Sequence, residues 1–133
     1  MNLSLSHIIH IHTGVGQGLE KEALLEARIA ATKEGGPIYS KLSQIEKFVA
    51  DNGKAGHAVG DKLSIADIMI YAQSSHVTCG FFDGVSGEAL TPFPNIQKVR
   101  KLVASHAAVV KYYEGKGDDI TPFEKYFRDA KDL

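Results

Sequence analysis

Apolar residues recur at helical spacing along most of this 133-residue chain. The clearest example is the series Ile38, Leu42, Ile45 and Val49, in which successive members are three or four residues apart. Residues so spaced share one face of an α-helix. The pattern, with its flanking turn residues, predicts helices at about residues 20–33, 37–52, 64–77, 94–105, 107–116 and 122–130. Every clear element is a helix, so the predicted class is all-α.

Glycine and proline mark the ends of these helices. Gly35-Gly36 is a stop, and Pro37 suits the first position of the next helix, which ends at Asn52-Gly53. Residues 79–95 form a long connection with three glycines and two prolines. A loop of this length in a small domain is usually functional or mobile.

The N-terminal residues 1–13 fit two patterns. Leu3, Leu5, Ile9 and Ile11 partly alternate, as in a strand, but the same stretch also offers a helical face.

Residues 63–68 carry the strongest local signal. Ser64 can cap the following helix, and Asp67 can accept a hydrogen bond from the Ser64 amide, which makes a capping box. Leu63 and Ile68 occupy the positions of a hydrophobic staple. The helix that follows is apolar nearly all round, which predicts a position inside the core.

These residues resemble the loop and capping box that open the central core helix in the C-terminal domain of cytosolic glutathione transferases. Downstream, Phe93-Pro94-Asn95-Ile96 resembles the family's Tyr/Phe-Pro-x-Leu helix, and residues 106–113 resemble its His-Pro-x-Val-x-x-Tyr segment. Upstream, residues 20–53 resemble the preceding helix, with a break at Gly35-Gly36-Pro37 like that of the mu and sigma classes. The resemblance covers residues 19–116 and implies a helical bundle.

The resemblance also implies a companion domain. The family's thioredoxin-like domain binds glutathione and carries the activating Tyr, Ser or Cys, and we expect no such domain in this sequence. We treat residues 1–133 as one domain of the C-terminal type, with residues 1–18 as a partial first helix and loop. Residues 118–133 are expected to form a C-terminal tail helix.

Composition narrows the choice of function. Hydrophobic residues make up 44% of the chain and charged residues 23%, which is typical of a soluble globular protein. A net charge of −1 gives no electrostatic reason to expect nucleic acid or an anionic membrane as partner. The single cysteine excludes an internal disulfide and favours the cytoplasm or another reducing compartment.

Several side chains invite chemistry that their surroundings do not support. His7, His10 and His12 have the spacing of metal ligands, but no Cys, Asp or Glu lies nearby in sequence, so we expect no metal site. The series Gly14-Val15-Gly16-Gln17-Gly18 falls one residue short of a dinucleotide motif, which favours a flexible loop. Cys79 lies near a helix C-terminus, where a thiol is not activated, so an inert role is favoured. His106 is assigned to packing or capping.

The resemblance points to one candidate pocket. In mu and sigma relatives the start of the core helix lines the pocket for the electrophile, and distance from the capping box places Met69, Ala72 and Gln73 there. Their spacing brings them together on one face. The competing interpretation, which we favour, is that Met69 and Ala72 belong to the core.

Two functions follow. The first is a protein-binding or assembly module that is not catalytic on its own, binds no cofactor alone, and contacts a partner or a second copy through the surface that the thioredoxin-like domain normally covers. The second is part of a mu- or sigma-like transferase that joins glutathione to small hydrophobic electrophiles. A ligand-storage protein is a third, weaker reading.

The capping box gives a direct prediction. Replacing Ser64 by Ala should lower the free energy of unfolding by about 1 kcal/mol, because an amide of the first helical turn loses its side-chain acceptor. Urea denaturation measures this change, and an unchanged midpoint would show that the box does not cap the helix.

Overall fold

A computed structural model describes residues 18–132 of the protein. Its regular elements are helices: α2 (Lys21–Thr32), α3 (Pro37–Asn52), α4 (Ile65–Thr78), α5 (Pro94–Ala104), α6 (Ala107–Lys116), α7 (Pro122–Arg128), and the 3₁₀ turns η1 (Gly87–Leu90) and η2 (Asp129–Asp132). Within the described residues the only β pairing is an isolated bridge between Gly53 and Gly60. The predicted all-α class is confirmed. The prediction for residues 1–13 lies outside the described residues.

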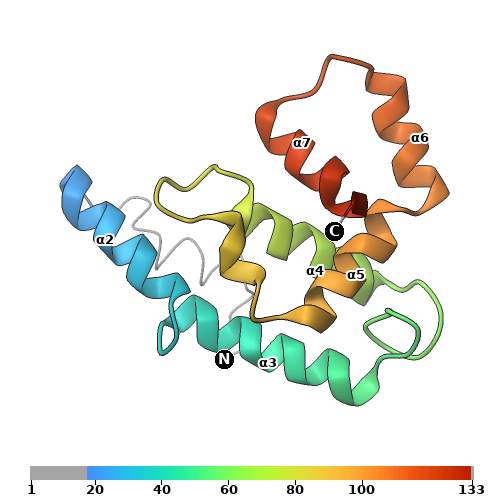
Figure 1. The fold of residues 1–133 in the computed structure, drawn as a ribbon, viewed down its shortest axis with the longest axis horizontal. Helices are drawn as coiled ribbons and strands as arrows, with labels where there is room; N and C mark the ends of the chain where they lie inside the picture. The colour runs from blue at the N-terminus through green and yellow to red at the C-terminus, as the bar shows by residue number, and fades with distance from the viewer. Residues whose placement is uncertain (1–17, 133) are drawn as a thin grey trace.

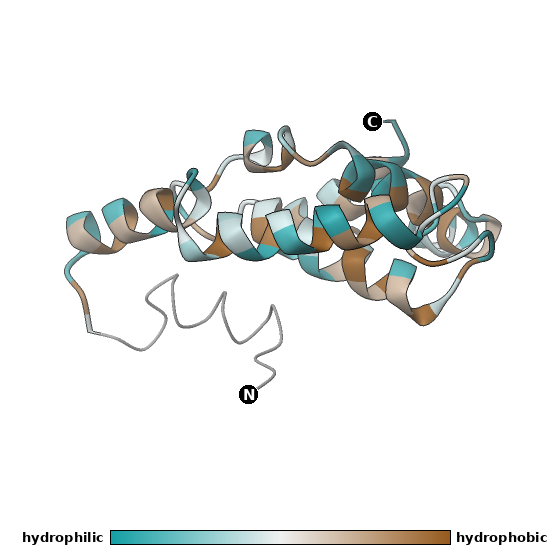
Figure 2. Cartoon of the chain, turned by 90° about the horizontal axis from the view of Figure 1, so that it is seen from below, coloured by the Kyte–Doolittle hydropathy of each residue, from teal (hydrophilic) through white to brown (hydrophobic). Residues whose placement is uncertain are grey.

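The helices are arranged in sequence order across the molecule. In Figure 1, α2 and α3 run one after the other along one edge, α4 and α5 lie in the middle, and α6 and α7 form a hairpin at the end away from α2. The contact between α4 and α5 is the most extensive between any two elements of the described chain. Figure 2 shows hydrophobic and hydrophilic residues alternating around the helices, as expected of amphipathic elements.

The core has two parts. The first gathers α3, η1 and the long connection around Ile38, Leu42, Phe82 and Leu90. The second joins the end of α3 to α4, α5 and the C-terminal turn through Val49, Tyr71, Val99, Val103 and Ala130. The face predicted for the helix at 37–52 therefore faces inward.

The prediction that the whole core helix lies inside the core is wrong for one side of α4. Ile65, Met69 and Ile68 are 73%, 49% and 44% exposed, and Leu63 is exposed as well. Burial is confined to the side that carries Asp67, Tyr71, Ser74 and Ser75. Apolar residues all round a helix indicate that every side could be buried, but they do not show which sides the other helices cover.

Asp67 joins the loop at residues 53–64 to the start of α4. Its Oδ2 accepts the Ser64 amide and the Ser64 hydroxyl at 2.7 Å each, within a reciprocal capping box. Its Oδ1 accepts the Ala58 amide, also at 2.7 Å. Burial raises the pKa of Asp67, but the hydrogen bonds from Ser64 and Ala58 outweigh burial and hold the pKa below its usual value.

Arg100 is a buried cation that joins three helices. From α5, its Nε donates to Ser75 Oγ of α4 at 3.2 Å and its Nη1 donates to Gln97 Oε1 at 2.6 Å. The guanidinium carbon lies 5.5 Å from the centre of the Tyr126 ring of α7. Within residues 18–132 it has no carboxylate partner, and burial lowers its pKa.

Two carboxylates fix the ends of other helices. Glu46 of α3 accepts the Asn95 and Ile96 amides at 2.9 Å, which caps α5 from a residue 49 positions away. Glu124 completes a second capping box with Thr121 at the start of α7 and pairs with Lys116 of α6. Hydrogen bonds from Lys116 and then Thr121 lower the pKa of Glu124 to about 2.

Acid should destabilise the fold through Asp67. Because the folded pKa of Asp67 lies below its unfolded value, its contribution is present above about pH 4 and is lost as the pH falls through the folded pKa. Asp67→Asn replaces one carboxylate oxygen by an NH₂ group, which then faces at least one of the three donors, so we expect a loss of about 2–3 kcal/mol at pH 7. The variant should also lose less stability than the wild type as the pH falls. Urea denaturation from pH 7 to pH 3 measures both effects. Asp51→Asn, on the surface of α3, is the control, and an equal response of the two variants would contradict the assignment.

Candidate functional site

The exposed side of α4 brings the predicted pocket residues together. At 3.6 residues per turn, Met69, Ala72 and Gln73 fall within one arc of about 140°, together with Ile65, Ile68 and His76. This side lies opposite the buried Asp67.

Solvent exposure bears on the interpretation of Met69 as a core residue. Its side chain is half exposed, whereas Ala72 and Gln73 are partly buried. The interpretation of Met69 as a core residue is therefore wrong. The hydrogen bonds of Asp67 turn the Asp67 side of α4 inward and leave Met69, on the other side, exposed to solvent.

No charged side chain lies on this side of α4. The helix sequence contains a single Asp, Glu, Lys or Arg, which is Asp67, and that residue points into the core. The exposed side of a helix ordinarily carries several Lys and Glu residues, because these residues are rarely buried. The exposed side of α4 thus has the composition of a contact surface.

Two phenylalanines extend this surface beyond the helix. The ring of His76 stacks on Phe81 with 5.7 Å between ring centres, and Phe81 meets the edge of Phe123 of α7 at 5.6 Å. Phe81 and Phe123 are 54% and 40% exposed. We call the combined surface of Ile65, Ile68, Met69, Ala72, Gln73, His76, Phe81 and Phe123 the α4 face.

Sequence reasoning did not place the two phenylalanines there. Phe81 lies in a long connection, and Phe123 lies in the first turn of α7, 45 residues after α4 ends at Thr78. Phe123, Tyr126 and Phe127 can share one side of the tail helix, which is a usable signal, but periodicity within one helix does not show which other helix that side approaches.

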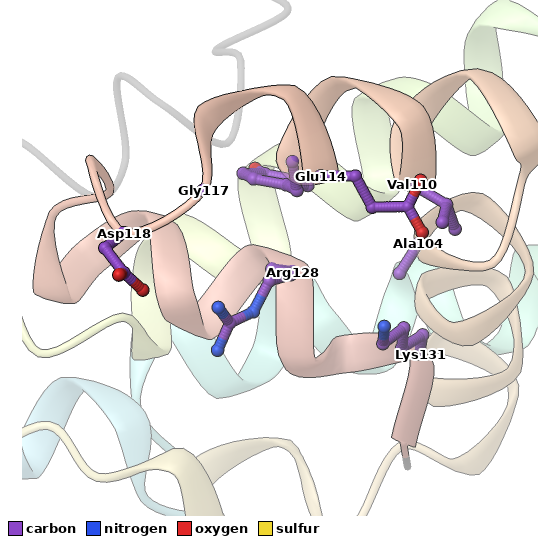
Figure 3. Close-up of a pocket in the computed structure, with 8 residues that line it drawn as sticks. Ala104, Val110, Glu114, Gly117, Asp118, Arg128 and Lys131 are labelled. Atoms are coloured by element: carbon purple, nitrogen blue, oxygen red, sulfur yellow. The ribbon is translucent and has the colours of Figure 1, made fainter.

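A second feature is a cavity of about 270 Å³ beneath α6 (Figure 3). Its lining comes from α5, α6, the loop after α6, α7 and η2, and consists of Ala104, Val110, Tyr113, Glu114, Gly117, Asp118, Arg128 and Lys131. Val110 and Tyr113 fall in the segment 106–113 that resembles the family's motif, but nothing in the sequence predicted that these residues line a cavity.

The comparison with protein families bears on residues 15–116, which match the model of the glutathione S-transferase C-terminal domain. The chain belongs to this family. The match covers well over half of the 133 residues. Neither the curated proteins nor the solved structures include a match to the sequence.

Two other residues that the sequence analysis considered in this glutathione S-transferase C-terminal domain, Cys79 and His106, form local hydrogen bonds. Cys79 is buried, and its Sγ lies 3.2 Å from the His76 carbonyl oxygen. His106 caps α6 through Nδ1, which accepts the Ala108 amide at 3.3 Å. The histidines at 7, 10 and 12 and the loop at 14–17 lie outside the described residues.

The described residues carry neither a cluster of metal ligands nor a membrane-spanning helix. Between residues 18 and 132, no three His, Cys, Asp or Glu side chains are grouped as metal ligands. No helix within the same residues has the length and apolar character needed to cross a membrane.

The exposure of Met69 predicts how the domain tolerates its loss. Met69→Ala should change the free energy of unfolding by less than about 0.5 kcal/mol, because little contact is lost at an exposed site. Leu42→Ala, at a fully buried site of α3, should cost about 2–5 kcal/mol. Urea denaturation of both variants tests whether Met69 is exposed. Similar losses in the free energy of unfolding would show that Met69 is a core residue.

Proposed function

We propose that this domain is a protein-binding module and that the α4 face is its docking surface. The observation that carries the proposal is an exposed, uncharged helix side that continues into two exposed aromatic rings. Contiguous exposed apolar patches on soluble domains commonly mark interaction sites. Depletion of charge, with enrichment of aromatic residues and Met, is the composition of an interface centre.

Burial of the face supplies the free energy of docking. Each Å² of apolar surface removed from water contributes about 25 cal/mol. Ile65, Met69 and Phe81 expose the largest fractions of their side chains on this face, so they are the expected anchors. The occupant is another protein or a second copy of the chain.

The described side chains give little support for catalysis by the chain alone. Conjugation to glutathione requires a thiolate, which a positioned hydrogen-bond donor stabilises. In the family that donor belongs to the thioredoxin-like domain. Tyr71 and Tyr113 both have raised pKa values because they are buried, which favours the protonated phenol and supplies no base. The single cysteine, buried and free, fits a reducing compartment such as the cytoplasm.

A transferase role is the second candidate, favoured by the position of Met69 beside Ala72 and Gln73 on the exposed face. In that role a thioredoxin-like domain holds glutathione, and these three residues contact the electrophile. The two candidates differ in one respect that is easily measured, which is turnover by the isolated chain.

A charge placed on the face tests the proposal. Met69→Asp should abolish association, because docking would bury an unpaired carboxylate. Phe48→Asp is the matched control, since Phe48 is 48% exposed but lies on α3. Sedimentation measures association with a second copy, and capture from native extract followed by mass determination measures association with another protein.

The wild type and the Phe48 variant should associate with the same component, and the Met69 variant should not. Equal behaviour of all three proteins would contradict the docking surface. Conjugation of glutathione to a chromogenic aryl halide by the purified chain would overturn the module in favour of the enzyme.

A further inference from the structure

Another cavity, distinct from the one beneath α6, has a volume of about 190 Å³ and lies between the end of α3, the loop that follows it and α5. Three of its lining residues can carry a positive charge, namely Lys54 and His57 from the loop and Lys98 from α5. Among the described residues that line it, none is an Asp or a Glu. In a chain whose net charge is −1, a cavity whose charged groups are all basic favours an anion.

The backbone holds these three basic residues around one space. The His57 amide donates to the Lys54 carbonyl at 2.9 Å, so these two residues close a single turn. A Cβ atom at Gly56, inside that turn, would lie 4.0 Å from the Cβ atom of Lys98. The turn therefore packs directly against α5 at the position of Lys98.

His57 is the member of the group whose position is fixed. Its side chain is 15% exposed, and its Nδ1 is buried without a hydrogen-bond partner among the described residues. That nitrogen lies 3.8 Å from Oδ1 of Asp67, a carboxylate with no exposed surface. The carboxylate favours a proton on Nδ1, and an imidazole protonated on both nitrogens also donates from Nε2. Asp67 thus orients the ring and leaves Nε2 as the donor for a ligand in the cavity.

The two lysines have no competing acid. Within residues 18–132, neither Lys54 nor Lys98 forms an ion pair at or below 4.0 Å. The carboxylate of Glu46, which lies beside the cavity residue Asn95, already accepts the amides at the start of α5. Both lysines are exposed, so their ammonium groups reach a ligand from the solvent side, and each contributes less than a buried cation would.

We propose that this cavity binds a phosphate group, either as free phosphate or as the end of a small phosphomonoester. Nε2 of His57 and the ammonium groups of Lys54 and Lys98 donate to its oxygens. A phosphate group carries close to two negative charges and several strong acceptor oxygens, which matches donors that come from a loop and from a helix.

The size of the cavity limits what accompanies the phosphate group. Pockets for drug-sized ligands measure about 300–1,000 Å³, and this cavity is smaller. The phosphate group therefore lies inside, and the remainder of an ester lies in solvent. The site shares no residue with the α4 face, so it is independent of the proposed docking function.

The test uses the full chain, with inorganic phosphate and glycerol 3-phosphate as probes and sodium chloride at matched ionic strength as the control. Lys54→Gln and Lys62→Gln each remove an ammonium from the same loop, and only Lys54 lines the cavity. Lys98→Gln and Lys111→Gln form a second pair, in α5 and α6, of which only Lys98 lines the cavity. Each pair has the same net charge, so long-range electrostatics cancel. His57→Gln removes the ring, and urea denaturation establishes that this variant is folded.

Titration followed by ¹H–¹⁵N NMR should show saturable shifts at residues 53–57 and 95–98 with the phosphate probes and no saturable shifts with chloride. Lys54→Gln and Lys98→Gln should weaken binding about threefold each, as expected for exposed charges. His57→Gln should weaken it about tenfold, because a fixed donor to a charged acceptor contributes more. The Lys62 and Lys111 variants should bind like the wild type, and a preference for one probe identifies free or esterified phosphate as the ligand.

Three results would overturn the proposal. The first is the absence of saturable shifts with both phosphate probes, and the second is saturation by chloride. The third is an equal effect of the two variants within each lysine pair, together with binding by a folded His57→Gln variant that is as tight as that of the wild type.

Discussion

One buried carboxylate decides how this domain presents itself to solvent. Asp67 accepts the Ala58 amide, the Ser64 amide and the Ser64 hydroxyl, each at 2.7 Å, and has no exposed surface. A buried charge is tolerated only when its hydrogen bonds are complete. The loop before α4 and the first turn of α4 are therefore held as one unit, with Asp67 facing inward. Since the opposite side of α4 must then face outward, the same hydrogen bonds that fix the helix also expose Met69 and its neighbours.

Arg100 links α4 to the helices that follow it in the chain. Its bond to Ser75 holds α5 against the inner side of α4, and its guanidinium lies over the ring of Tyr126 of α7. A guanidinium that stacks on an aromatic ring and bonds to neutral groups needs no carboxylate, though its burial lowers the pKa. By placing α7, Arg100 also sets where Phe123 meets Phe81 and where Arg128 faces α6. Both candidate surfaces thus depend on the position of α7.

The two surfaces differ in the physics of recognition. The α4 face offers apolar area without charge, which gives affinity through the removal of water and favours a large partner. The cavity beneath α6 is lined by charged side chains of both signs and by a few apolar ones, and its volume of about 270 Å³ suits a small ligand. Membership of the glutathione S-transferase C-terminal family accounts for the fold. The fold alone does not assign a function, so the two sites carry the functional argument.

Local signals in the sequence determined the elements of this protein. Apolar periodicity, Pro37 and Pro94 at helix starts, and the Ser64 and Thr121 caps predicted every α-helix from α2 to α7 to within a residue or two, because each signal acts within one or two turns. Tertiary structure alone decided the cap of α5 by Glu46, the cation–π contact of Arg100, the exposed side of α4 and the charged cavity. These features join residues from separate helices, which local sequence signals do not relate to one another. For the apolar helix α4, the side that packs on other helices is fixed only by the hydrogen bonds of its one buried charge, Asp67.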